Sequence, residues 1–146
     1  MSVAGTIELA SYVGAGLCIG LGAIGAAVGE GYTAGFANRA ISLKESIAGD
    51  IMKTMLVGQA VAESAAIFAL VIAILLIFMD FPGQGMLGAA SMFGAGICMG
   101  FGAIGSGWGS GFPGGQACLG MARQPAVAGK LTTNMLIGSA VCQTPA

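Results

Sequence analysis

Two acidic residues lie in segments of this chain that are otherwise apolar. Glu63 is in the middle of the run MLVGQAVAESAAIFALVIAILLIF at residues 55–78, and Glu30 lies in the glycine-rich stretch GAAVGEGYTAGF. A charge at bilayer depth costs about 3 kcal/mol on insertion scales, so acidic residues in apolar spans generally mark the path of an ion or substrate. We therefore predict that Glu30 and Glu63 form a transport site.

The two carboxylates are expected at the same depth. Counted from a loop centre near Ile47, Glu30 lies 17 residues back and Glu63 lies 16 residues forward, and each helical residue advances about 1.5 Å. On antiparallel helices the two side chains would meet near the midplane. Two carboxylates at close range in a low dielectric cannot both stay ionised, so one takes a proton or a bound cation neutralises the pair. This behaviour is typical of a reversible cation site.

Neighbouring polar residues can complete such a site. Ser64 could donate to a carboxylate or offer its oxygen to sodium, and Gln59, one turn before Glu63, could order the cluster. A hard monovalent cation prefers such oxygen ligands. The sequence has no His and no clustered Cys for a transition metal, and it shows no nucleotide site and no nucleophile–base pair. We therefore predict a transport protein for Na+ or H+ that is not an enzyme by itself and needs no cofactor.

The composition places this transport site in a membrane protein. Hydrophobic residues make up 56% of the chain and charged residues 8%, and the apolar runs exceed the roughly 18 to 20 residues that span a bilayer. A net charge of -1 leaves no basic patch for nucleic acid. The N-terminus carries Glu8 and no basic residues, so we expect no removable signal peptide and a first span that stays in the protein.

The elements that must position the carboxylates follow from an internal repeat. An offset of 80 residues aligns almost the whole chain with itself: SYVGAGLCIGLGAIG at residues 11–25 matches SMFGAGICMGFGAIG at residues 91–105. Each repeat holds two apolar segments around a polar loop, which predicts an all-α membrane protein of two tandem-duplicated hairpins. The expected hairpins are residues 1–80 and 81–146, and the expected transmembrane helices are 9–36, 51–79, 87–115 and 131–146. The last helix is short, about 16 residues, and suggests a truncated or fragmentary chain.

The basic residues predict the orientation of the helices. Arg39, Lys44 and Lys53 surround the first loop, and Arg123 and Lys130 surround the third. By the positive-inside rule both loops face the cytoplasm and both termini face the other side. Because each repeat has an even number of spans, the two halves insert with the same orientation, unlike the inverted repeats common in secondary transporters.

Glycine spacing separates the helices into two kinds. The first and third helices carry glycines four residues apart, which lets helix backbones approach closely, whereas residues 67–78 of the second are almost continuously large and apolar. This pattern predicts a narrow inner ring of glycine-rich helices within a wider lipid-facing ring. The glycine pairs are Gly16 with Gly20, Gly25 with Gly29, Gly31 with Gly35, Gly96 with Gly100, Gly105 with Gly109, and Gly111 with Gly115.

The segments around the two carboxylates, GEGYTAG and GQAVAESAAIFALVIAILL, resemble the proteolipid c subunit of rotary ATPases, and the resemblance covers essentially the whole chain. In that family the outer helix of a hairpin carries the ion-binding carboxylate, here Glu63, and the inner helix supplies a Gln or second Glu at the position of Glu30. The resemblance also implies a backbone carbonyl ligand from Val61, two residues before the carboxylate. It implies a ring of identical or related proteolipids in membrane lipid, with the a/I subunit of the stator and the central stalk subunits as partners.

The subtype and the ion follow less directly from the resemblance. The duplicated four-helix form is similar to the V/A-type K subunit, whereas the loop motif ARQP and the Glu63–Ser64 pair look like F-type c subunits; a V-like c subunit of a sodium F-type ATP synthase satisfies both. Phe68 stands where sodium-type relatives often have a Tyr, so Na+ and H+ both stay open. In the ARQP motif, Arg123, Gln124 and Pro125 look like the family's stalk-contact loop, a pattern that the first loop, SLKE, has lost.

The second hairpin departs from the family pattern. Ser110 replaces Glu30 and Gln143 replaces Glu63, so this hairpin cannot carry a proton by itself. The resemblance then implies one ion site in two hairpins, which lowers the number of ions moved per rotor turn and favours ATP-driven pumping. Gln143 and Thr144 could instead lend oxygens to a neighbouring site.

Two other classes of protein fit parts of the pattern. A small four-helix multidrug or cation exporter also uses a membrane-embedded Glu, but it needs aromatic residues near the carboxylate, and the surroundings of Glu30 are mainly Gly and Ala. A structural membrane protein with Glu30 and Glu63 as helix contacts would show no dependence of carboxylate reactivity on sodium or pH.

Overall fold

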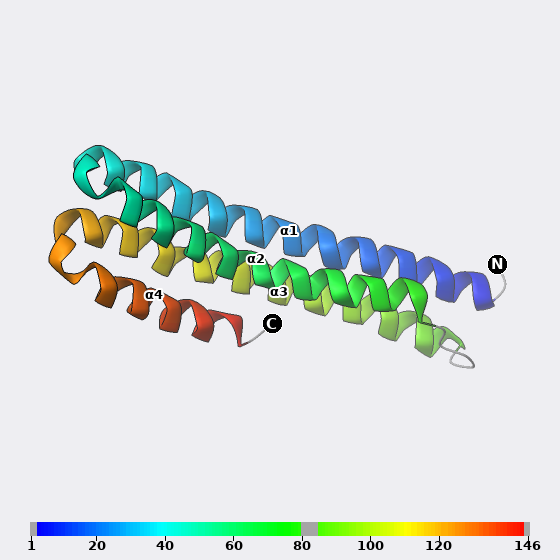
Figure 1. Cartoon of the computed structure of the whole chain (residues 1–146). Helices are drawn as coiled ribbons and strands as arrows, with labels where there is room; N and C mark the ends of the chain where they lie inside the picture. Colours follow the sequence, from blue (N-terminus) through cyan, green and yellow to red (C-terminus); the bar gives the residue numbers. More distant parts are fainter. Residues whose placement is uncertain (1–2, 80–84, 145–146) are drawn as a thin grey trace.

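The computed structural model describes residues 3–79 and 85–144, and this part of the chain forms two helical hairpins (Figure 1). The first consists of α1 (Val3–Leu43) and α2 (Ala48–Phe78), joined through the one-turn helix η1 (Glu45–Ile47). The second consists of α3 (Gly85–Arg123) and α4 (Ala128–Gln143), joined through η2 (Pro125–Val127). The predicted all-α fold of tandem hairpins is confirmed.

The two hairpins run in the same direction. Figure 1 shows η1 and η2 side by side at one end of the molecule, and α4 ends part of the way along α3. Within the described residues, three helical segments are long and apolar enough to cross a membrane: Val3–Leu43, Glu45–Phe78 and Gly85–Arg123. The 16 residues of α4 fall below that length.

The predicted ends of the glycine-rich helices at residues 36 and 115 are wrong. Helix α1 continues to Leu43 and α3 to Arg123, so Arg39 and Arg123 lie on helices rather than in long loops. The extensions are helical because they share a small core of their own, in which Ala37, Ala40 and Ile51 pack with Cys118, Leu119 and Met121. Tertiary burial therefore maintains the helices beyond the point where the apolar spans were expected to end.

Helices α1 and α3 pack backbone against backbone. A Cβ atom added to Gly25 would lie 2.5 Å from the Cα of Ile104, and one added to Gly107 would lie 2.7 Å from the carbonyl carbon of Gly25. In the same way, a Cβ added to Gly29 would meet the backbone of Gly107, and one added to Gly111 would meet the backbone of Gly29. In a bilayer there is no hydrophobic driving force between helices, and such close contacts stabilise their association through dispersion energy.

Within the described residues, only one of the two glycine faces of α1 contacts another helix. Gly16, Gly20, Gly31 and Gly35 have no atom within 4 Å of an added Cβ and are exposed. The glycine pairs that they were predicted to form therefore make no helix contact within the described part of this chain.

A buried threonine links the backbones of α1 and α3. The Oγ1 of Thr33 lies 3.0 Å from the carbonyl oxygen of Gly29 on its own helix and 3.0 Å from the carbonyl oxygen of Gly111 on α3. The glycines opposite it leave space for this approach, because an added Cβ on Gly114 would lie 2.9 Å from Thr33 Oγ1.

Helix α2 covers the groove between α1 and α3 with a face of small residues. Gly58, Ala62, Ala65, Ala69 and Ala73 are among its buried positions. Most of the large side chains in its second half are exposed: Ile67, Phe68, Leu70, Val71, Ile74, Leu75, Ile77 and Phe78. An apolar outer surface of this kind suits contact with lipid, as predicted for the outer helix.

We predict that Gly25→Leu destabilises the packing of the two hairpins, whereas Gly16→Leu does not. Overpacking in a closely packed contact costs about 1–3 kcal/mol or more, and Gly16 has open space in this chain. Both changes replace glycine by leucine in α1, so helix propensity is matched. The measurement is thermal unfolding of the detergent-solubilised chain by circular dichroism, and equal midpoints for the two variants would contradict the packing described.

Candidate ion-binding site

Glu30 and Glu63 come from adjacent helices of the first hairpin. Glu30 lies on α1 and is half-buried, and Glu63 lies on α2 and is exposed. Gln59 on α2 lies at the same height as Glu30 on α1, and its Nε2 donates to the backbone oxygen of Glu30 at 3.3 Å. The pair thus lies in the middle part of both helices, far from η1.

Ser64 and Val61 form a separate set of contacts on α2. The hydroxyl of Ser64 donates to the carbonyl oxygen of Val61 at 2.6 Å. The same carbonyl accepts a second hydrogen bond, 2.8 Å long, from Nε2 of Gln143 on α4. The carbonyl that was expected to bind an ion therefore faces the second hairpin and already accepts two side-chain donors.

Gln143 is the centre of a polar cluster between the hairpins. Its Oε1 accepts from the hydroxyl of Ser106 at 3.0 Å, and its Nε2 lies 3.2 Å from the Oγ of Ser110. The hydroxyl of Ser139 donates to the Ser110 backbone oxygen at 3.1 Å. Sequence reasoning missed Ser106, although its position one turn before Ser110 on the same helix was a usable signal.

Thr144 lies beside this cluster without joining it. Its hydroxyl donates to the carbonyl oxygen of Val141 at 2.8 Å, and the residue is exposed. This contact repeats that of Ser64 with Val61, 80 residues earlier in the chain.

The loop residues Arg123, Gln124 and Pro125 form the tight turn between α3 and α4. Arg123 and Gln124 are exposed and Pro125 is half-buried. The backbone of Gln124 (φ -137°, ψ 80°) closely matches that of Lys44 in the first turn (φ -152°, ψ 81°). The two turns therefore keep one geometry although the ARQP pattern is present only in the second.

Comparison with known proteins matches both hairpins separately. The family model for the C subunit of ATP synthase matches residues 13–76 and, a second time, residues 93–146. The chain is 47% identical over 78 residues to the ATP synthase c subunit of Natranaerobius thermophilus, a match that covers 53% of this chain and 88% of that protein. It is 42% identical over 73 residues to the second ATP synthase c subunit of Cereibacter sphaeroides, covering 50% of this chain and 88% of the relative.

A chloroplast relative gives the same result. The chloroplastic ATP synthase c subunit of Ostreococcus tauri is 46% identical over 69 residues, covering 47% of this chain and 84% of the relative. Each of these relatives corresponds to about half of this chain, which agrees with the duplication of one hairpin unit.

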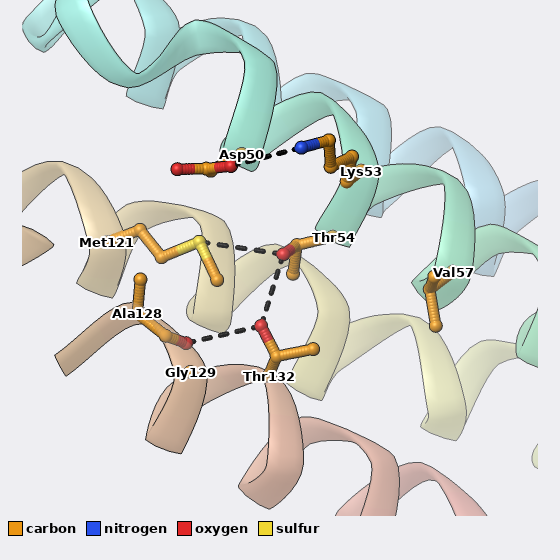
Figure 2. Close-up of a pocket in the computed structure, with 8 residues that line it drawn as sticks. All are labelled: Asp50, Lys53, Thr54, Val57, Met121, Ala128, Gly129 and Thr132. Carbon is orange, nitrogen blue, oxygen red and sulfur yellow. Dashed lines mark hydrogen bonds and ion pairs between the residues drawn. The ribbon is translucent and has the colours of Figure 1, made fainter.

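A groove at the loop end of the molecule is lined by residues other than Glu30 and Glu63 (Figure 2). It has a volume of about 390 Å³ and lies where the first turns of α2 and α4 meet the end of α3. Among its lining residues, Nζ of Lys53 lies 3.4 Å from Oδ1 of Asp50, and the hydroxyls of Thr54 and Thr132 are 3.2 Å apart. The remaining lining residues are Val57, Met121, Ala128 and Gly129.

The Thr54–Thr132 contact is predicted to couple α2 to α4. Thr54 is 4% exposed, and a buried hydrogen bond contributes about 1 kcal/mol. Thr54→Val and Thr132→Val should each lower the free energy of unfolding by about that amount, and the double variant by less than the sum. The measurement is a double-mutant cycle of unfolding in detergent, and strictly additive effects would show that the two hydroxyls do not interact.

Proposed function

The chain belongs to the family of ATP synthase c subunits, and from this membership we propose that it is a rotor proteolipid that carries Na+ or H+ across the membrane on Glu63. It is an integral membrane protein and a non-catalytic part of a larger complex. The observation that carries the proposal is the exposure of Glu63 on the apolar outer face of α2.

The distribution of acidic residues supports this assignment. The sequence has six Asp and Glu residues. Glu8, Glu45, Asp50 and Asp80 lie near the ends of the apolar segments, so Glu30 and Glu63 are the two that lie deep within them. A carboxylate at that depth is tolerated when it is neutralised, and an ion carrier needs a group whose neutralisation is reversible.

The transport cycle follows from the exposure of Glu63. In an aqueous half-channel formed by the a/I subunit of the stator, the Glu63 carboxylate exchanges its cation with water. Once neutralised by Na+ or H+, the side chain passes into lipid alongside Phe68 and the other exposed apolar residues of α2. Rotation of the ring returns it to a second half-channel, where the cation leaves. Glu30 stabilises the bound cation because two adjacent carboxylates disfavour the empty, doubly charged state.

The second hairpin determines how many ions each chain carries. It has Ser110 and Gln143 at the positions equivalent to Glu30 and Glu63, and neither side chain titrates. Each chain therefore moves one ion for two hairpins. When fewer ions share the free energy of ATP hydrolysis, each can be moved against a larger gradient, which favours ATP-driven pumping.

The partners and orientation follow the same proposal. Further proteolipid hairpins complete a ring in membrane lipid, the basic loop ends face the cytoplasm, and both termini face the opposite side. The exposed turn at Arg123, Gln124 and Pro125 contacts the central stalk.

We predict that Glu63→Gln abolishes ATP-driven cation transport while the ring still assembles. The amide keeps the size of the side chain, but it is already neutral, so it neither takes up a proton nor balances the charge of a bound cation. The measurement is uptake of radioactive sodium, and of protons by a pH-sensitive dye, into vesicles containing the whole complex. Glu45→Gln, which changes an exposed acidic residue at η1, is the control with transport retained. Retained transport in Glu63→Gln would contradict the proposal.

The proposal assigns the stalk contact to the second turn. We predict that Arg123→Glu uncouples ATP hydrolysis from transport, and that Arg39→Glu at the end of α1 has a much smaller effect. Both changes reverse one exposed positive charge at the same end of the molecule. The measurement is the ratio of ions transported to ATP hydrolysed, and equal ratios in the two variants would exclude a special role for the second turn.

A further inference from the structure

We propose that the junction between the two hairpins of this chain is a permanently closed copy of the ion site, in which the amide nitrogen of Gln143 takes the position of the cation. The inference rests on the proposed function only in identifying Glu63 as the ion-carrying group. Its own basis is the hydrogen bonding of Gln143 and the 80-residue repeat.

The repeat makes Gln143 the structural equivalent of Glu63. The same offset relates Ser110 to Glu30 and Val141 to Val61. The contacts of Gln143 therefore show what the residue at this position of a hairpin reaches. It reaches the inner helix of its own hairpin, at Ser110, and the outer-helix carbonyl of the adjacent hairpin, at Val61.

The amide forms hydrogen bonds with the oxygen atoms that would otherwise be able to bind a cation. Its nitrogen lies 2.8 Å from the Val61 carbonyl oxygen and 3.2 Å from the Ser110 hydroxyl oxygen. Its oxygen accepts from Ser106 at 3.0 Å. A primary amide has two N–H donors, so one neutral side chain binds the oxygens that converge here. Because an amide does not exchange a proton or a cation at physiological pH, this junction stays closed.

The test converts the closed junction into a second ion site with Gln143→Glu. The number of carboxyls per chain that react with a hydrophobic carbodiimide in the assembled ring is expected to double, and peptide mass spectrometry locates the added label at residue 143. Reaction there should be suppressed by the same condition, sodium or high pH, that suppresses it at Glu63. Ala140→Glu is the matched control, because it places a carboxyl within one turn on the exposed side of α4 and should not show that suppression.

An added carboxyl at residue 143 that behaves like that of Ala140→Glu would overturn the inference. The double variant Glu63→Gln with Gln143→Glu separates the two proposals, because it should carry one reactive carboxyl per chain, now at residue 143. If Glu63 of the unaltered protein is unreactive while this variant is labelled, the proposed function fails and the closed junction stands.

A second variant tests the junction without adding charge. Gln143→Met keeps the length of the side chain but removes both N–H donors. It should lower the midpoint of thermal unfolding of the ring in detergent, as measured by circular dichroism, because the Val61 carbonyl and the Ser106 and Ser110 hydroxyls lose their partner. An unchanged temperature would show that the amide does not close the junction.

Discussion

The close approach of α1 and α3 is the contact on which the rest of the structure depends. It requires glycine at Gly25, Gly29, Gly107 and Gly111, where a Cβ would meet the backbone of the opposite helix. Because these two helices touch, α2 can lie in the groove between them with its alanine face. Ser106 and Ser110 then lie next to the contact glycines, within reach of Gln143. Wider separation of α1 and α3 would pull the polar groups of the junction apart.

The two hairpins contain different kinds of polar group at bilayer depth. The first hairpin has one carboxylate on each of its helices, Glu30 and Glu63, and a charge at that depth is disfavoured unless it is neutralised. In the second hairpin the equivalent positions are neutral and bonded, and no cation is required. The two hairpins share a fold and a turn geometry. They differ at one position of the outer helix, which is occupied by a carboxylate at Glu63 and by a neutral amide at Gln143.

The repeat and the glycine spacing predicted the arrangement of the helices because both patterns can be recognised in the sequence alone. The helix ends were predicted wrongly because Ala37, Ala40 and Cys118 belong to a local core that extends the helices. The polar residues around them gave no sign of this core in the sequence. Glycine spacing also could not tell which face of α1 meets α3, since Gly16 and Gly31 have the same spacing signal as Gly25. The contact of Gln143 with Val61 joins residues 82 positions apart, so it depends on how the hairpins dock and leaves no local pattern.

The most direct test of the account is the reaction of the unaltered ring with a hydrophobic carbodiimide, which modifies protonated carboxyls, followed across pH with and without sodium. The account predicts a single modified residue per chain, Glu63, whose modification is suppressed by sodium in a sodium-coupled ring or by rising pH alone in a proton-coupled one. Modification of other acidic residues in preference to Glu63, or a reaction at Glu63 that neither sodium nor pH alters, would contradict it.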